Sequence, residues 1–381
     1  MYGPTEHKRN KLFTYWIEIV GTCNLRCPTC PQGNFRDIEF STGRNPTGFM
    51  ELNVYKQILE KIKADNISDR VEIHLYTWGE PLLHPKVAEF VTLTKEMGFF
   101  CGLSSNLNLN KNLKNVIKAN PDFFRISLSG FYQDNYQKTH KRGDIRVVKS
   151  NMYRLRHMLD QYENKTEVHV LYHVYKHNAG DDLLMMLKLC TELEFGFEPV
   201  WAFYMPLEKS LSYLGGTVSS EDKNIIDMLA MDPVGVSRAA QPFRDQDCNL
   251  RKTQMTLNVD GSVQLCCATF DKAQVVAPSF VNASHNELQS LRYKNDICGP
   301  CMDNGQHVYF TMGVGEKLDE MGEQTLKKNN SKFIFKQFSE PRLRLRDENE
   351  DMAIVLPRLP KKKRNRGLRR IANKLLGRQV G

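Results

Sequence analysis

The chain has 381 residues, of which 41% are apolar and 25% charged, a composition typical of a soluble globular protein with a sizeable core. No stretch approaches the roughly 18 apolar residues of a membrane-spanning helix, and the polar start lacks the apolar run of a secretory signal, so we expect a cytoplasmic protein. The net charge is +9, but residues 352–381 hold ten Lys and Arg and no acidic residue, which leaves 43 basic against 44 acidic residues elsewhere. A uniformly basic surface for specific nucleic-acid binding is therefore not expected.

Strand-like and helix-like segments alternate through the first half of the chain. Runs rich in β-branched and aromatic residues predict strands at 12–20, 71–78, 99–106, 123–130, 167–175 and 197–205. Apolar residues at helical spacing predict helices between them, at 54–62, 87–97, 113–117 and 183–193. Alternation at about 30-residue spacing is typical of βαβ units and a parallel sheet. We expect an α/β fold, a partial barrel of six β/α units of the TIM type, with the chemistry at the C-terminal ends of the strands.

Three cysteines directly follow the first expected strand. Cys23, Cys27 and Cys30 have the spacing Cys-x3-Cys-x2-Cys. In a compartment where thiols stay reduced, the ten cysteines of the chain favour metal ligation or catalysis over disulfides. Three thiolates would leave one position of an iron–sulfur cluster open, and a zinc site is the alternative. Cys101 and Cys190 fall inside an expected strand and an expected helix, where we expect small core residues.

This motif resembles the cluster motif of the radical S-adenosylmethionine (radical SAM) superfamily. The resemblance implies that Cys23, Cys27 and Cys30 hold a [4Fe–4S] cluster and that SAM binds the open iron, where its cleavage gives a 5′-deoxyadenosyl radical. It also implies an electron donor such as flavodoxin or ferredoxin. Thr29 departs from the pattern, because the family usually has an aromatic residue before the last cysteine.

Polar residues at later strand ends resemble the SAM contacts of that family. "WGEP" ends the second expected strand and matches a Gly-Gly-Glu-Pro-like motif at Gly79, Glu80 and Pro81, with Trp78 in place of the first glycine. A carboxylate there would form a charge-assisted hydrogen bond with the SAM amino group. The resemblance implies that further SAM contacts come from Ser105, Asn106, Ser129 and Arg142.

Five more cysteines follow the expected barrel, at Cys248, Cys266, Cys267, Cys298 and Cys301. Residues 256–267 predict a hairpin that turns at an Asp-Gly pair, and Cys-x2-Cys at 298–301 is a spacing that lets two thiolates reach one metal site. The pattern resembles the SPASM/twitch domains that follow radical SAM barrels. Because no cysteine follows Cys301, the twitch form with one auxiliary [4Fe–4S] cluster is favoured over two clusters. Its ligands would be Cys248, Cys266, Cys298 and Cys301, and a zinc site at the same four residues is the alternative.

The expected activity follows from the auxiliary cluster, in which four thiolate ligands would leave no iron free to bind a substrate. Such a cluster can accept the electron that a substrate radical loses, which predicts dehydrogenation of a small polar, sugar-like substrate. Epimerisation is the second hypothesis, with Cys267 returning a hydrogen atom, although a core position for Cys267 is equally expected. A peptide-modifying maturase ranks lower, because few residues precede the first strand. A zinc-stabilised binding module is the non-enzyme alternative.

The expected organisation has a radical SAM barrel at 10–215, an auxiliary iron–sulfur domain at 240–310, and a polar extension with a basic tail at 311–381. A helix that contains Ile225 and Leu229 is expected to connect the first two parts.

The tail itself carries a weak helical pattern. Leu368, Ile371 and Leu375 recur at helical spacing among basic residues. We expect this segment to attach the protein peripherally to an anionic membrane surface, with a solvated tail as the alternative.

Overall fold

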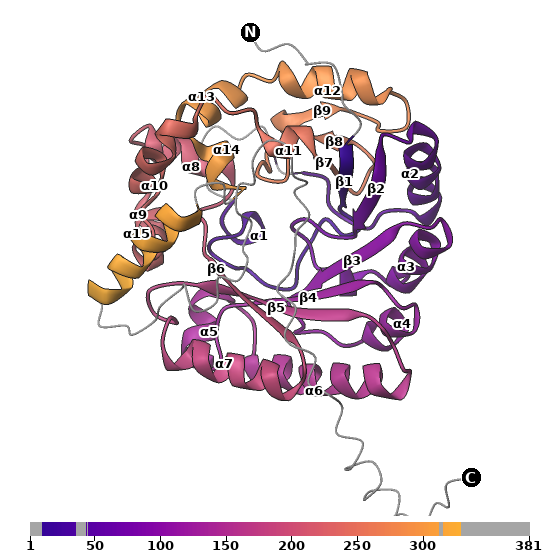
Figure 1. Cartoon of the computed structure of the whole chain (residues 1–381), viewed down its shortest axis with the longest axis horizontal. Coiled ribbons are helices and arrows are strands. Elements are labelled where there is room, and N and C mark those ends of the chain that lie inside the picture. The colour runs from indigo at the N-terminus through magenta and orange to yellow at the C-terminus, as the bar shows by residue number, and fades with distance from the viewer. Residues whose placement is uncertain (1–9, 36–42, 44, 312–314, 329–381) are drawn as a thin grey trace, which may run out of the picture.

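The computed structural model describes residues 10–35, 43, 45–311 and 315–328. The chain forms a nine-stranded sheet in the order β6-β5-β4-β3-β2-β1-β7-β8-β9. The sheet curves strongly, and helices cover its outer side (Figure 1). Its strands are β1 (Asn10–Ile17), β2 (Ser68–His74), β3 (Phe100–Ser105), β4 (Phe123–Leu128), β5 (Glu167–Val174), β6 (Gly196–Trp201), β7 (Gln254–Leu257), β8 (Val263–Gln264) and β9 (Val275–Ala277).

The first six strands are parallel, and each pairs with the next strand in the sequence. All six expected strands are present, and the expected α/β partial barrel is confirmed. Each strand ends one to four residues before the predicted position, where the chain turns into the loop that follows. The barrel is not closed, since β6 and β9 are the two edges of the sheet.

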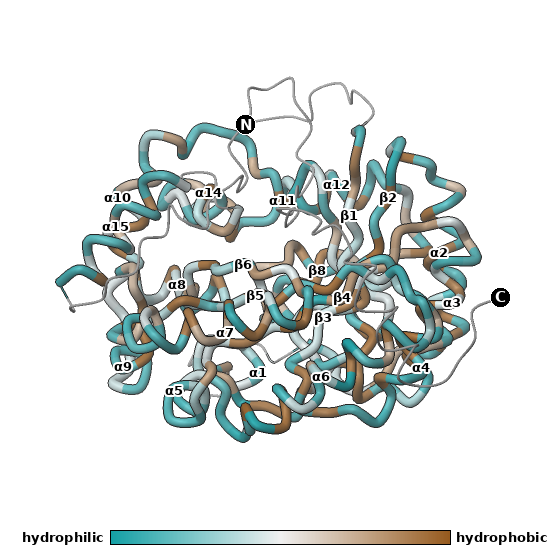
Figure 2. The backbone as a smooth tube through the Cα atoms, turned by 60° about the horizontal axis from the view of Figure 1, so that its bottom comes forward, coloured by the Kyte–Doolittle hydropathy of each residue, from teal (hydrophilic) through white to brown (hydrophobic). Residues whose placement is uncertain are grey.

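Most of the connecting helices of this half pack their apolar residues on the outside of the sheet, whereas the first, short one lies inside the curve of the sheet (Figure 1). The helices are α1 (Pro31–Asn34), α2 (Leu52–Asp65), α3 (Val87–Glu96), α4 (Leu113–Lys118), α5 (Gln133–Thr139), α6 (Ile145–Gln161), α7 (Asp181–Glu192) and α8 (Leu207–Leu214), with a short 3₁₀ helix η2 (Pro81–Leu83). In α2, Tyr55, Ile58, Leu59 and Ile62 are fully buried on one face, as expected for an amphipathic helix. Figure 2 shows hydrophobic and hydrophilic residues alternating along the helices around the sheet. The four expected helices are present, whereas α5 and α6 were not predicted.

Residues of the parallel strands alternate between this helical layer and the inside of the barrel. In β4, Phe124, Ile126 and Leu128 belong to the main hydrophobic core. Arg125 and Ser127, between them, line an internal cavity instead. This two-residue period places polar side chains inside the barrel and apolar side chains under the helices.

The C-terminal half begins with two helices and then returns to the sheet. Its helices are α9 (Ser220–Met228), α10 (Pro233–Ala240), α11 (Asn249–Lys252), α12 (His285–Tyr293), α13 (Cys298–Asp303), α14 (Gln306–Tyr309) and α15 (Gly315–Lys328), with 3₁₀ helices η3 (Gln241–Phe243) and η4 (Lys272–Gln274). The expected connecting helix is α9. The expected hairpin is present as antiparallel β7 and β8. In addition, β7 pairs in parallel with β1, from Thr14 opposite Gln254 to Ile17 opposite Leu257, so the hairpin continues the main sheet.

Among the described residues, no helix combines the length and apolar character needed to cross a membrane. The basic tail at 352–381, with its expected amphipathic helix, lies outside the described residues.

Candidate active site

Cys23, Cys27 and Cys30 line one cavity of about 320 Å³ at the C-terminal ends of the parallel strands. They lie on the loop that follows β1, and Cys30 is the N-cap residue of α1, where its carbonyl oxygen accepts hydrogen bonds from the Gly33 and Asn34 amides. Arg26 fixes the loop by donating from Nη1 to the carbonyl oxygens of Cys23 and Leu25, both at 2.9 Å. Burial raises the pKa of the Cys23 and Cys30 thiols to about 12, so metal ligation would be needed to hold them as thiolates at neutral pH.

The second wall of the cavity is the loop that follows β2, and it packs directly on the cysteine loop. A Cβ atom at Gly79 would lie 1.7 Å from the carbonyl oxygen of Val20. The Glu80 amide donates to the carbonyl oxygen of Thr22 at 3.0 Å. Only glycine fits at such an approach, which gives a steric reason for the glycine of the "WGEP" motif.

Glu80 and Asn106 connect that loop to the cysteines. The Glu80 carboxylate is buried and accepts hydrogen bonds from the Leu82 amide at 3.0 Å and the Asn106 amide at 2.8 Å. The Asn106 side chain donates to the sulfur of Cys23 at 3.6 Å. Burial raises the pKa of Glu80 to about 7. Ser105 also lines the cavity, so these three expected site residues are brought together.

Three other expected residues do not line the cavity. Pro81 is buried at the start of η2. Ser129 is buried behind the cavity wall, where its hydroxyl contacts Thr139 and lies 2.8 Å from Nδ1 of His140. Arg142 lies on the turn between α5 and α6 with a positive φ of 73°.

The structure adds side chains that the sequence analysis did not select. Tyr76, Thr77, Trp78 and Arg125 line the cavity, and each has a buried polar side-chain atom without a hydrogen-bond partner in the described part of the chain. The wall of the cavity therefore combines aromatic and polar side chains. The alternation along β4 could have identified Arg125.

An aromatic ring also borders the cysteine loop. The hydroxyl groups of Thr29 and Tyr175 lie 2.8 Å apart, and both residues line the cavity. Tyr175 follows β5, so it brings a ring to the position where Thr29 lacks the expected aromatic side chain.

Glu18, the first residue after β1, was also missed. Its carboxylate is buried and accepts hydrogen bonds from three successive amides, at 3.4 Å from Thr77, 2.8 Å from Trp78 and 2.9 Å from Gly79. Its own amide donates to Leu257 of β7 at 2.8 Å. Glu18 therefore ties the ends of β1 and β7 to the loop that walls the cavity. A single acidic residue in the apolar run 12–20 was the available signal.

Replacing Glu18 with alanine should lower the free energy of unfolding by about 2 kcal/mol, because three half-buried amides lose their acceptor. Glutamine keeps one acceptor oxygen and should cost less. Burial raises the pKa of Glu18 from 4.5 to about 7, so between these values the folded chain binds more protons than the unfolded chain. Wild-type stability should therefore fall as the pH rises from 4.5 to 7, by up to about 3 kcal/mol from this group.

Urea unfolding of the iron-free chain at pH 5 and pH 8 measures both effects. E18Q lacks the titrating group, so its stability relative to the wild type should improve at the higher pH. Parallel pH dependences of the two proteins would contradict this role for Glu18.

A second group of cysteines lies on the C-terminal half. Cys248, Cys266, Cys298 and Cys301 belong to one hydrophobic cluster and line a second, smaller pocket, and we call them the four-cysteine site. Cys248 is the N-cap of α11, Cys266 follows β8, and the other two lie on α13. Burial raises the pKa of each of these thiols. Within the described residues, no three His, Cys, Asp or Glu side chains are grouped so as to hold one metal ion.

The remaining cysteines differ in their surroundings. Cys101 of β3 and Cys190 of α7 are buried in the main core, as expected. Cys267 is half-buried, with its sulfur 3.9 Å from Oε1 of Gln254, which also accepts a hydrogen bond from Trp16.

Comparison with known proteins identifies the barrel. The family model "Radical SAM superfamily" matches residues 17–190. These residues form a radical SAM domain. The radical SAM match ends before the four-cysteine site.

The radical SAM domain has curated relatives. The chain is 29% identical over 115 residues to a tungsten-containing aldehyde ferredoxin oxidoreductase cofactor-modifying protein of Pyrococcus furiosus, covering 30% of each chain. It is 32% identical over 88 residues to the S-adenosyl-L-methionine-dependent 2-deoxy-scyllo-inosamine dehydrogenase of Niallia circulans, covering 23% of this chain and 32% of the relative. The match thus spans about a third of the length of these relatives. A solved structure of BtrN with AdoMet and 2-DOIA is 17% identical, with a TM-score of 0.42, and covers 78% of this chain and 89% of BtrN.

Proposed function

We propose that the chain is a radical SAM oxidoreductase that dehydrogenates a small polar, sugar-like substrate. The observation that carries this proposal is the presence of two separate cysteine groups, one of three residues at a polar cavity and one of four in an apolar cluster. Three ligands leave a position open for SAM, whereas four ligands close a cluster and suit it for electron transfer.

The residues at the first group fit a [4Fe–4S] cluster with SAM. The three cysteines line one cavity, and the lack of a side chain at Gly79 lets the loop after β2 pack against the start of the cysteine loop. The polar side chains that line this cavity, among them Thr77, Asn106 and Arg125, suit a ligand with several polar groups. Cys23, Cys27 and Cys30 would hold the cluster, while Glu80 and Asn106 would border SAM.

The residues of the four-cysteine site fit an auxiliary [4Fe–4S] cluster, because four thiols from three separate segments converge in one apolar cluster. When bound, the first cluster supplies an electron to SAM and the auxiliary cluster accepts one from the substrate, so that the substrate loses two hydrogens overall. The barrel side chains would orient the substrate and exclude water. Flavodoxin or ferredoxin would be the electron donor.

The basic tail at residues 352–381 would contact an anionic membrane surface.

The experiment that tests this proposal is mass spectrometry of small-molecule extracts incubated with the anaerobically reconstituted, reduced protein and SAM. A product two hydrogens lighter than its precursor, formed together with 5′-deoxyadenosine, supports dehydrogenation. SAM cleavage with products of unchanged mass contradicts it.

Epimerisation is a second candidate, favoured by the position of Cys267. A charge on its sulfur would raise the pKa of Tyr76, so the thiol lies near a residue that lines the cavity. Reaction in D₂O separates the candidates, because a returning thiol would add one deuterium to a product otherwise unchanged. If the protein is an epimerase, the C267A variant should no longer incorporate deuterium into the product. If it is a dehydrogenase, C267A should still form the dehydrogenated product.

A further inference from the structure

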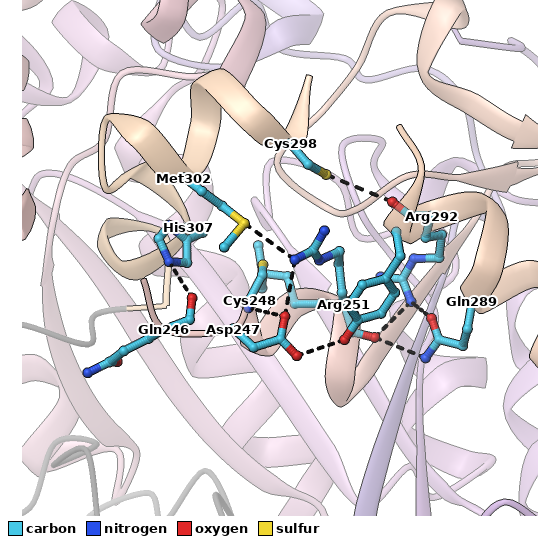
Figure 3. A network of polar contacts seen from close by, with 11 residues as sticks. Gln246, Asp247, Cys248, Arg251, Gln289, Arg292, Cys298, Met302 and His307 are labelled. Carbon is cyan, nitrogen blue, oxygen red and sulfur yellow. Dashed lines mark hydrogen bonds and ion pairs between the residues drawn. The ribbon is translucent and has the colours of Figure 1, made fainter. Parts of the chain in front are cut away.

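Two buried arginines border the four-cysteine site. Arg251 lies on α11, three residues after Cys248, and Arg292 lies near the end of α12 (Figure 3). Arg251 donates from Nη2 to Asp247 at 3.1 Å and to the sulfur of Met302 at 3.3 Å. Its guanidinium also stacks over the Tyr293 ring, 4.2 Å from the ring centre. Met302 directly follows Cys301 on α13, so Arg251 spans the space between the two segments that carry these cysteines.

Arg292 is completely buried, and its hydrogen-bond acceptors are all uncharged. Its guanidinium donates to three backbone carbonyl oxygens, at 2.7 Å from Leu250, 3.1 Å from Arg251 and 2.8 Å from Leu265. It also donates to Oε1 of Gln289 at 2.9 Å. These carbonyl groups belong to the segments that carry Cys248 and Cys266, so the charge is fixed next to both.

The carboxylates near the site do not balance these two charges. Asp247 is the partner of Arg251, and its side chain is 38% exposed. Within the described part of the chain, no carboxylate lies within ion-pair distance, 4.0 Å, of Arg292. A buried cation without an anion is strongly unfavourable. The four-cysteine site could carry the missing negative charge, because Arg292 binds the carbonyl groups of Leu250 and Leu265, next to Cys248 and Cys266.

An oxidised [4Fe–4S] cluster with four thiolates has a net charge of about −2, and reduction by one electron adds another negative charge. With Asp247 paired to Arg251, the two guanidinium groups offset part of the charge of the first state and favour the second, because positive charge near a cluster stabilises its reduced form. We infer that Arg251 and Arg292 supply the balancing charge of the auxiliary cluster and raise its reduction potential, which makes it an electron acceptor. This inference rests on the proposed auxiliary cluster at the four-cysteine site.

The test compares R251Q, which removes the charge, with R251K, which keeps it. K252Q is the matched control, because it makes the same charge change at an exposed residue of the same helix. Each protein is reconstituted anaerobically, and the auxiliary cluster is titrated with dithionite and mediators under electron paramagnetic resonance. We expect the reduction potential of the auxiliary cluster to be lower in R251Q by about 59 mV or more, which is a tenfold smaller equilibrium constant for its one-electron reduction. R251K and K252Q should stay close to the wild type.

The outcomes separate this inference from the proposed function. A wild type with only one cluster would overturn the proposed function itself. If R251Q loses the auxiliary cluster and R251K keeps it, the charge is needed for assembly, which supports the inference. An unchanged potential in R251Q, equal shifts in R251Q and R251K, or loss of the cluster in both would overturn the role of the charge. R292K and R292Q repeat the comparison at the fully buried position.

Discussion

Replacement of Cys23, Cys27 or Cys30 with alanine should abolish SAM cleavage. Each variant removes one of three ligands, and two thiolates do not hold a stable [4Fe–4S] cluster with an open iron. The expected loss is complete, to the background rate of the iron-free protein. The measurement is 5′-deoxyadenosine formed by the reduced protein with SAM, quantified by chromatography.

C190A is the matched control, because Cys190 of α7 is a cysteine that is buried in the main hydrophobic core, away from both cysteine groups. It should cost some stability through the small cavity that it leaves, but it should keep both its iron and its SAM cleavage. Normal cleavage in any single variant of Cys23, Cys27 or Cys30 would refute the assignment of these ligands.

Replacement of Cys248, Cys266, Cys298 or Cys301 should separate SAM cleavage from product formation. The wild type should contain about eight iron atoms per chain, and each variant about four, because the first cluster is assembled by other residues. SAM cleavage should remain within a few-fold of the wild type, while the dehydrogenated product disappears. Iron analysis and product mass spectrometry measure the two effects on the same preparations.

C267A serves as the control for these four variants, because Cys267 lies beside Cys266 but would not be a ligand. It should retain the full iron content. Stoichiometric zinc in the wild type, without iron at this site, would contradict an electron-accepting role and favour the zinc alternative.

The six parallel strands could be predicted because each is a local run of β-branched and aromatic residues. The placement of Cys23 at the cavity followed from the same pattern, since the C-terminal ends of parallel strands meet at one side of a sheet. The side chains that complete the cavity were harder to predict. Arg125 faces inward because of the register of β4, and its partners on neighbouring strands, Ser104 and His169, are distant in the sequence.

Ser129 shows why a position after a strand does not place a side chain. Arg125 and Ser127 face the cavity, and continued alternation would place residue 129 there as well. However, β4 ends at Leu128, and the chain turns so that the Ser129 hydroxyl contacts Thr139 and His140. The role of Glu18 was hidden for a related reason, because its acceptor function depends on amides about sixty residues away.

The pairing of β7 with β1 was not predictable from either strand alone, since the two segments are far apart in the sequence and β7 has only four residues. This pairing has a consequence for electron tunnelling. One strand leads into the cysteines of the radical SAM domain, and the other leads into the hairpin that precedes Cys266. A hinge motion between the loop that follows β1 and the hairpin would have to break these hydrogen bonds. If both groups carry clusters, this pairing would hold the Cys23 loop and the Cys266 loop at a fixed separation, which favours a constant tunnelling distance between the clusters.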